Sequence, residues 1–307
     1  MKTIIVISRH INLNKEVIGI LKGIYNLVQL EDINRLFDVC FTEPPDLILL
    51  DTNVLNTRLS AAISNLKSDP LFAHLPILIV IDTVDQIKGI SLRSIIDDYL
   101  IAPFDIHDLT FRMDLCTLRA QKILETNPLT RLPGNITIIK EIQRRIDTDS
   151  LFSFAYADLD HFKPFNDRYG FSRGDEVIRM TARLISNIIK IKGPEESFVG
   201  HIGGDDFVFI ITGVENIDTV CSELCANFDE IIQSFYDPEE RAKAFIEALD
   251  RDGKRRTFPL LTLSIGIAHN KHKGFSHYGQ VSEIASEMKK HAKTFTGSRY
   301  MIDRRTK

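Results

Sequence analysis

The first hundred residues alternate between short apolar runs and segments whose apolar side chains recur at helical spacing. The expected strands are residues 3–8, 28–30, 45–51, 77–81 and 99–101, and the expected helices are residues 16–24, 33–41, 59–66 and 87–95. Strands that are apolar throughout and are separated by helices are typical of a parallel sheet covered on both faces. The pattern therefore predicts a doubly wound α/β domain, with functional groups at the carboxyl ends of its strands.

A long helix is expected from Asp105 to about Thr126, where the pair Asn127-Pro128 ends it. Its apolar residues at spacings of four, three, four and three are Leu109, Met113, Cys116, Ala120 and Ile123. This spacing is typical of a seam between two chains, and equally of a last helix packed on its own sheet. The length of 307 residues favours two domains, here 1–122 with a helical linker to 126, and 127–307.

The second half contains a predicted hairpin with a charged tip. Apolar runs at Phe198–Ile202 and Phe207–Ile211 flank two glycines and two aspartates, Asp205 and Asp206. Glycines permit positive φ and let a bulky anion approach the backbone. Adjacent carboxylates are suited to a hard cation such as Mg²⁺, although the four residues alone are also an ordinary turn.

A second group of polar residues follows the predicted strand 151–160. Asp158 at its end is placed to meet Asp205 across a sheet, which is the paired-carboxylate arrangement of phosphoryl-transfer sites. Lys163 is placed to meet phosphate oxygens, and Asn166 and Asp175 offer the amide and carboxylate edges that guanine needs. A helix is expected from Glu176 to Ile191, and together these spacings predict a nucleotide site.

Composition and charge exclude several classes of protein. A formal charge of −4 gives no reason to expect a nucleic-acid surface, and no apolar run is long enough for a membrane span. The N-terminus lacks the architecture of a signal peptide. The cysteines follow no metal or disulfide pattern, so a reduced, cytoplasmic location is expected; they are Cys40, Cys116, Cys221 and Cys225.

The first 120 residues resemble a response-regulator receiver domain, which has a flavodoxin-like fold. The resemblance rests on the order of the elements, on Asp51 closing the third strand, and on residues 97–104 at the fifth. In that family an acidic pair helps bind Mg²⁺, an aspartate accepts phosphate and a lysine precedes a proline. Here Ser8-Arg9-His10 replaces the acids and Ala102 replaces the lysine, which implies a degenerate receiver used for dimerisation or sensing. Phosphorylation of Asp51 remains the less favoured alternative.

Residues 127–307 are similar to the GGDEF domain of diguanylate cyclases, an α/β fold like that of nucleotidyl cyclases with a central antiparallel sheet. The similarity is carried by residues 158–175, by the Gly-Gly-Asp-Asp-Phe tip at 203–207, by the opening segment 127–135, by the late strand 261–268 and by Ala292-Lys293. The resemblance implies that two GTP molecules, one on each domain of a homodimer, condense to cyclic di-GMP and pyrophosphate in the presence of Mg²⁺ or Mn²⁺.

The resemblance also implies a role for each matching residue. Asp158, the Leu159 carbonyl, Asp205 and Asp206 would hold the metal ion, and the two tip acids would promote deprotonation of the 3′-hydroxyl. Lys163 and Lys293 would neutralise phosphate charge. The remaining residues implied to bind GTP are Asn166, Asp175, His161, Phe162 and Leu129.

Four features depart from the family pattern. Asp206 replaces a glutamate, which withdraws the carboxylate by about 1.3 Å. The inhibitory product-binding motif is missing at residues 194–197, which implies no feedback inhibition at that site, and Gly297 stands where an arginine is expected, with Arg299 two residues later. The segment 237–259 is longer than the corresponding segment of a typical GGDEF domain, and its sequence predicts an inserted hairpin that turns at Asp252-Gly253. We interpret this hairpin as a charged surface elaboration or, alternatively, as a contact for a partner.

Two functions are therefore open. The first is a diguanylate cyclase regulated by its N-terminal domain, with a homodimer, GTP and an upstream signalling partner as its partners. The second is a catalytically weak GGDEF domain that binds GTP or cyclic di-GMP and regulates another protein. The retained Asp158, Lys163, Asp175 and Lys293 favour the enzyme, whereas Asp206 and the degenerate receiver favour the regulatory module. Neither nucleic acid nor a membrane is expected as a partner.

Overall fold

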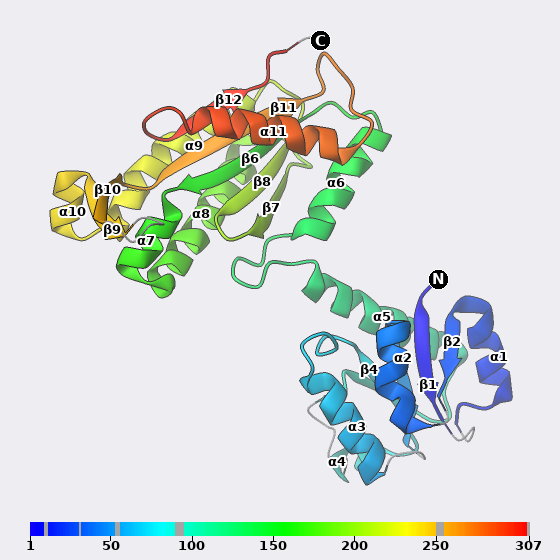
Figure 1. Ribbon diagram of the computed structural model, residues 1–307. Helices are drawn as coiled ribbons and strands as arrows, with labels where there is room; N and C mark the ends of the chain where they lie inside the picture. The colour runs from blue at the N-terminus through cyan, green and yellow to red at the C-terminus, as the bar shows by residue number, and fades with distance from the viewer. Residues whose placement is uncertain (9–11, 31, 53–55, 90–94, 250–254, 306–307) are drawn as a thin grey trace. The chain divides into compact units, whose positions relative to one another are not determined.

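The computed structural model describes residues 1–305 except residues 9–11, 31, 53–55, 90–94 and 250–254. Its contacts divide the chain into two compact units, Met1–Leu124 and Glu125–Lys307 (Figure 1). Among the described residues, no helix has the length and apolar character needed to cross a membrane.

The first unit is built on a five-stranded parallel sheet in the order β2-β1-β3-β4-β5. The strands are β1 (Thr3–Ile7), β2 (Asn26–Gln29), β3 (Leu47–Asp51), β4 (Ile77–Ile81) and β5 (Asp98–Ile101). Alternate strand residues enter two separate apolar clusters, one on each face of the sheet. The sequence prediction of a parallel sheet covered on both faces is confirmed.

Helices cover both faces of this sheet. Helices α1 (Lys15–Ile24) and α5 (Ile106–Leu124) pack on one face, and α2 (Leu36–Thr42) and α3 (Thr57–Ser68) pack on the other. A short 3₁₀ helix, η1 (Ile33–Arg35), precedes α2. The helix expected over residues 87–95 is α4 (Val84–Gly89), which starts three residues earlier; Ile95 lies in a turn, and residues 90–94 are outside the described part.

The apolar stripe of α5 faces its own sheet. Leu109, Met113 and Cys116 are buried in the apolar cluster beneath α5, and Ala120 is buried as well, whereas Ile123 is 66% exposed. The four buried residues are covered by their own domain and have no surface left for a second chain. For Leu109, Met113, Cys116 and Ala120 the alternative of a last helix packed on its own sheet is confirmed and the interchain seam is wrong. Ile123 lies outside that packing, so its part in an interchain contact stays a prediction.

The second unit contains a five-stranded sheet in the order β12-β11-β6-β8-β7. The strands are β6 (Phe152–Asp160), β7 (Phe198–Gly203), β8 (Asp206–Thr212), β11 (Thr262–His269) and β12 (Arg299–Ile302). The expected antiparallel sheet is found in the pairs β7-β8, β8-β6 and β6-β11, whereas the edge strand β12 runs parallel to β11, so the sheet is mixed.

Helices lie on both faces of this sheet (Figure 1). Helices α6 (Asn135–Asp147) and α11 (Tyr278–Ala292) pack on one face, and α7 (Phe162–Tyr169), α8 (Phe171–Lys192) and α9 (Ile217–Ile231) pack on the other. Helix α8 begins five residues before the expected Glu176, because Gly170 at φ 84° reverses the chain directly after α7. Residues 171–175, which precede the expected start, therefore already belong to the helix.

An additional segment follows α9. It comprises η3 (Ile232–Phe235), α10 (Pro238–Lys243), β9 (Phe245–Leu249) and β10 (Arg255–Pro259), and the two strands pair antiparallel. The expected turn at Asp252-Gly253 lies outside the described residues. Glu240 of α10 attaches the segment to α7, because it accepts hydrogen bonds from Arg168 Nε at 2.7 Å and from the Tyr169 hydroxyl. The segment is thus anchored beside the helix that carries Lys163.

Gly266 of β11 determines how closely α11 approaches the sheet. A Cβ atom at this position would lie 2.0 Å from the Ala285 carbonyl oxygen and 2.1 Å from the Lys289 amide nitrogen. Both neighbours are backbone atoms, so only a shift of the whole helix would make room. The absence of a side chain at residue 266 is therefore what lets α11 lie against the sheet.

We predict that Gly266→Ala lowers the free energy of unfolding by at least about 2 kcal/mol, as overpacking does in a dense core. Urea denaturation of the full chain measures this. Gly274→Ala is the matched control, because nothing lies within 4 Å of a Cβ at residue 274, and its effect should stay below about 0.5 kcal/mol. Equal effects of the two substitutions would contradict the close approach of α11.

Candidate active site

The turn between β7 and β8 forms the tip of the second unit's hairpin. Gly203 and Gly204 have φ values of 151° and 59°, which residues other than glycine rarely adopt. The turn presents Asp205, and Asp206 opens β8 directly opposite Asp158 of β6 in the antiparallel register. The expected hairpin is confirmed, with Asp206 rather than Asp205 as the direct cross-strand neighbour of Asp158.

A buried histidine contacts the turn at this tip from the side of the core. The His201 ring stacks on Phe207 with centroids 4.4 Å apart, and its Nε2 lies 3.1 Å from the Gly204 carbonyl oxygen while its Nδ1 lies 3.0 Å from the Thr130 hydroxyl. A carbonyl only accepts, so Nε2 carries the proton and Nδ1 accepts from Thr130. The opening segment of the unit is thereby tied to the tip.

Two lysines of α11 and its end reach into the acidic group. Lys289 Nζ lies 2.9 Å from Asp158 Oδ1 and 2.8 Å from Asp206 Oδ1. Lys293 Nζ donates to Asp158 Oδ2 and lies 3.2 Å from Asp160 Oδ1. Of these residues, Asp158, Asp206 and Lys293 were predicted from the sequence to share a site. The structure brings Lys293 into contact with Asp158 and places Asp206 opposite Asp158 on the neighbouring strand.

The electrostatics of this group reflect burial and crowding of charge. Burial raises the pKa of Asp205, and the charge of Asp158 adds to the effect. Burial also raises the pKa of Asp206, and it outweighs the hydrogen bond from Lys289. Burial acts to lower the pKa of Lys293, but the hydrogen bond to Asp158 and that residue's charge outweigh it and raise the pKa. Burial is thus the main reason that the pKa values of both tip acids are raised.

The donor atoms of this site suit a hard cation. Asp158, Asp205 and Asp206 contribute carboxylate oxygens, the ligand atoms that a hard divalent cation prefers. Leu159 lies beside them and donates its N–H to the Asp205 carbonyl at 3.3 Å. In the described part of the chain, no three acidic, histidine or cysteine side chains converge as a complete metal site, and both Asp158 oxygens accept from lysines.

The residues predicted to read guanine lie on α7 and α8. Asn166 is on α7, and its Oδ1 atom is buried without a hydrogen-bond partner among the described residues. Gly174 of α8 leaves room for it, since a Cβ there would lie 1.9 Å from that oxygen. Asp175 follows on α8 and is half-buried. A buried polar atom without a partner is costly, so Oδ1 is suited to a donor from a ligand.

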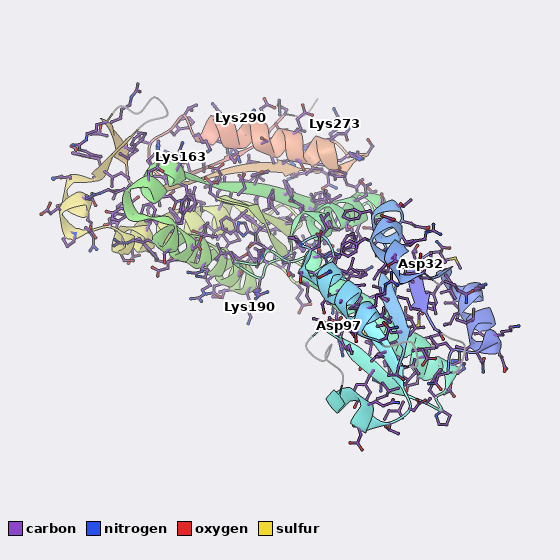
Figure 2. All side chains as sticks on the ribbon, turned by 60° about the horizontal axis from the view of Figure 1, so that its bottom comes forward. Asp32, Asp97, Lys163, Lys190, Lys273 and Lys290 are labelled. Atoms are coloured by element: carbon purple, nitrogen blue, oxygen red, sulfur yellow. The ribbon has the colours of Figure 1, made fainter. Side chains whose placement is uncertain are left out.

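The other predicted GTP residues occupy the same region with different exposure. His161 is exposed in the left-handed region at φ 63°, and Phe162 is buried in the core. Leu129 is half-buried against the same core. Lys163 is exposed on α7 (Figure 2) and lines a pocket of about 1140 Å³ between α7 and the inserted segment. None of the described ion pairs or hydrogen bonds joins Lys163 to the acidic group.

The end of α11 differs from the family pattern as expected. Gly297 has φ 78°, and Arg299 opens β12 with its guanidinium 5.6 Å from the Phe295 ring centroid. The structure therefore places Arg299 on an aromatic ring rather than beside the acidic group.

In the first unit, Asp51 ends β3 as a fully buried carboxylate. It accepts hydrogen bonds from Ser8 Oγ at 3.3 Å, from the Asn12 backbone amide at 3.1 Å and from Asn12 Nδ2 at 3.4 Å. Arg9 and His10, which were expected in place of metal-binding acids, lie outside the described residues. The role of Asp51 as a phosphoacceptor stays a prediction, but its side chain is enclosed by donors from this chain.

Comparison with known protein families identifies the second unit. The family described as "Diguanylate cyclase, GGDEF domain" matches residues 125–298, which is more than half of the chain. The chain belongs to the GGDEF family. The resemblance inferred from the hairpin tip and from residues 158–175 is thereby confirmed.

Several curated relatives share this part of the chain. The bifunctional diguanylate cyclase/cyclic di-GMP phosphodiesterase MucR of Pseudomonas aeruginosa is 25% identical, covering 66% of this GGDEF chain and 30% of the relative. A diguanylate cyclase of Vibrio cholerae is 28% identical over 38% of each chain. The response regulator PleD of Caulobacter vibrioides is 27% identical, covering 55% of this chain and 40% of the relative. The chain thus spans less than half the length of these relatives.

The chain is also similar to proteins of solved structure, at lower sequence identity than to the curated relatives. The coiled coil and GGDEF domain of DgcB from Caulobacter crescentus, in complex with c-di-GMP, is 22% identical with a TM-score of 0.48, covering 64% of this chain and 95% of that one. The GGEEF domain of a diguanylate cyclase from Vibrio cholerae is 20% identical with a TM-score of 0.43, covering 57% and 99%.

Sequence reasoning missed three members of the acidic group. Lys289 precedes Lys293 by one helical turn, so the two share a face of α11, a signal that the sequence contains. Asp160 accepts from Thr262 Oγ1 at 2.9 Å and from Ser264 Oγ at 2.6 Å as well as pairing with Lys293. Tyr156 hydrogen-bonds Asp206, and burial raises the pKa of Tyr156 to about 12.

We predict that acid weakens the second unit through His201. Burial lowers the pKa of His201 despite its hydrogen bond to Gly204, so the stability it contributes is present above about pH 6.5 and is lost as the pH falls through the lowered value. Urea unfolding of the full chain between about pH 7.5 and 5 should show a smaller loss of stability in His201→Phe than in the native protein. Equal losses of stability in the two proteins would contradict the role of His201. Burial also lowers the pKa of His269, which is present in both proteins and therefore contributes equally to each.

Proposed function

We propose that this chain is a diguanylate cyclase, which condenses two GTP molecules into cyclic di-GMP with release of pyrophosphate. The observation that carries the proposal is the meeting of Asp158, Asp206 and Lys293 at the tip of the GGDEF hairpin, with Asp205 beside them. The relatives named diguanylate cyclase, which share this part of the chain, support the same activity.

A divalent ion, Mg²⁺ or Mn²⁺, would be held by Asp158, Asp205, Asp206 and the Leu159 carbonyl. When bound, such an ion offsets the charge on the α-phosphate and eases loss of the 3′-hydroxyl proton. The raised pKa of Asp205, which burial and Asp158 cause, suits a proton acceptor close to that hydroxyl. Asp206 contributes through the same carboxylate cluster, although Lys289 already binds one of its oxygens.

The guanine base would lie over α7 and the start of α8. Asn166 Oδ1, which has no described partner, would accept from the base, and the Asp175 carboxylate would accept from the ring N–H and the amino group. Adenine has a hydrogen-bond acceptor where guanine has its ring N–H, so the Asp175 carboxylate would favour guanine over adenine. Leu129, His161 and Phe162 would line the base and sugar from the core side.

Lysines would hold the phosphates. Lys293 lies at the acidic group with its side chain 37% exposed, so it can exchange Asp160 for a phosphate oxygen without crossing the core. Lys163 is exposed on α7 and has the reach of a long flexible stem. Their ammonium groups would neutralise the charge that develops during phosphoryl transfer.

The active form would be a homodimer in which each GGDEF domain supplies half of the site. The N-terminal unit would act as a flavodoxin-like pseudo-receiver that regulates the GGDEF domain and receives an upstream partner's signal. Its strand order, 2-1-3-4-5, supports this reading. The burial of Asp51 among three donors, together with Ala102 in place of a lysine, argues against a phosphorylation switch.

A regulatory module that binds GTP or cyclic di-GMP without turnover is the second candidate. The pairing of Asp206 with Lys289 favours it, because a carboxylate occupied by an internal lysine is less available to a metal ion.

Turnover of purified protein with GTP and Mg²⁺ tests the proposal, with nucleotides separated by chromatography. We expect cyclic di-GMP from the native chain and at least about a hundredfold less from Asp205→Ala, because a positioned acid or base contributes roughly this factor. Lys290→Met, which changes an exposed residue of α11, should retain activity. If no product forms while calorimetry still detects binding of GTP or cyclic di-GMP, the cyclase proposal is wrong and the chain is a regulatory module.

We also predict that Gly174→Ala weakens GTP binding at least about tenfold while the domain stays folded. The new methyl group would displace the Asn166 amide, whereas alanine favours a helix interior over glycine by about 1 kcal/mol. Calorimetry with a GTP analogue and urea unfolding separate the two effects. Unchanged affinity would show that Asn166 does not contact the base.

A further inference from the structure

Lys289 is a buried lysine at the centre of the acidic group. Its residue is 8% exposed, and its ammonium nitrogen contacts Asp158 at 2.9 Å, Asp206 at 2.8 Å and the Tyr156 ring, whose centroid is 3.8 Å away. Lysine is rarely buried unless it is paired, and this one has an anion on two sides and an aromatic face on a third. The Lys289 ammonium group therefore occupies a cation-binding position between two carboxylates and an aromatic ring.

The backbone holds this cation in place. Gly266 allows the Lys289 amide nitrogen to lie against β11, and Ala285 and Ala292, which flank Lys289 on α11, are fully buried. A helix packed this closely cannot rotate away from the sheet. Lys293 differs, because its side chain is 37% exposed against 10% for Lys289. Lys293 can turn to solvent or to a phosphate, whereas Lys289 stays between the two carboxylates.

Charge counting shows what Lys289 does to the site. The carboxylates of Asp158, Asp160, Asp205 and Asp206 face two ammonium groups, so the described group carries two excess negative charges. One divalent cation would balance them. A second divalent cation would need both the charge and the oxygen atoms that Lys289 now occupies, because two cations held by the same carboxylate oxygens repel each other.

We propose that Lys289 is a built-in cation that occupies the place between Asp158 and Asp206 where a divalent ion would otherwise bridge the two carboxylates. The GGDEF domain of this chain then binds one divalent ion fewer than its acidic residues would allow. This inference rests on the proposed function for its setting, but it concerns the binding of the ion itself and not turnover.

A purely structural role for the ion pair is the competing explanation. In that case the removal of the ammonium group would change stability and leave the binding of divalent ions as it was. If Lys289 takes the place of an ion, its removal opens a site for one. The number of bound ions therefore separates the two explanations, and it needs neither GTP nor activity.

The experiment counts Mn²⁺ bound by the full chain, using electron paramagnetic resonance of free Mn²⁺ and calorimetry. Lys289→Met keeps the length of the side chain and removes its charge, and we expect it to bind one Mn²⁺ more than the native protein, with at least tenfold tighter overall affinity. Lys290→Met removes the same charge from the next, exposed residue of α11 (Figure 2), and Lys289→Arg keeps a cation; both should match the native count. An unchanged count and affinity in Lys289→Met would overturn the proposal.

A folding defect in Lys289→Met would also decide the question. The two carboxylates would then lack their cation, and we expect millimolar Mn²⁺ to restore the native circular dichroism spectrum that the variant loses in chelator. Failure of Mn²⁺ to restore it would overturn the proposal. The result is independent of the proposed function, because a chain that makes no cyclic di-GMP would still show the extra ion, and an active chain could still lack it.

Discussion

The balance between acids on β6 and β8 and lysines on α11 is the interaction on which the second unit's active end depends. Asp158 and Asp206 are direct neighbours across two strands, Asp158 buried and Asp206 half-buried, and carboxylates in such a place repel each other unless a cation lies between them. Removal of one partner from a buried ion pair typically costs about 3–5 kcal/mol. The hairpin tip, the end of β6 and α11 are therefore held together by charge as well as by apolar packing.

This balance requires a particular backbone. Gly266 brings α11 within reach of the sheet, and the two tip glycines let the chain reverse so that Asp206 enters β8 opposite Asp158. His201 then fixes the Gly204 carbonyl from the core side. Each of these residues acts on the position of a carboxylate or an ammonium group. The shorter Asp206, where the family has glutamate, lies within hydrogen-bonding distance of Lys289, so an internal lysine and a short acid occur together in this chain.

The sequence predicted much of this arrangement. Apolar runs of strand length that are bounded by turn residues favour strands, so the five strands of the first sheet and four of the second were predicted, including the tip hairpin. The short edge strand β12 was not predicted. The family pattern pointed to Asp158, Asp205 and Lys293. The stripe on α5 was ambiguous, because the same heptad spacing buries a helix against its own sheet or against another chain. Lys289 was missed because its role depends on the depth at which α11 packs, and a lysine in an amphipathic helix ordinarily points to solvent. The start of α8 was expected five residues too late, because the sequence does not show that Gly170 lets a second helix begin directly after α7.

The most direct test of this account is a crystal structure of the full chain grown with Mn²⁺ and a non-hydrolysable GTP analogue, with the ions located by anomalous scattering. The account predicts one Mn²⁺ per chain beside Asp158 and Asp205, with the Lys289 ammonium group still between Asp158 and Asp206. A second Mn²⁺ between those two carboxylates, with Lys289 displaced from them, would contradict it.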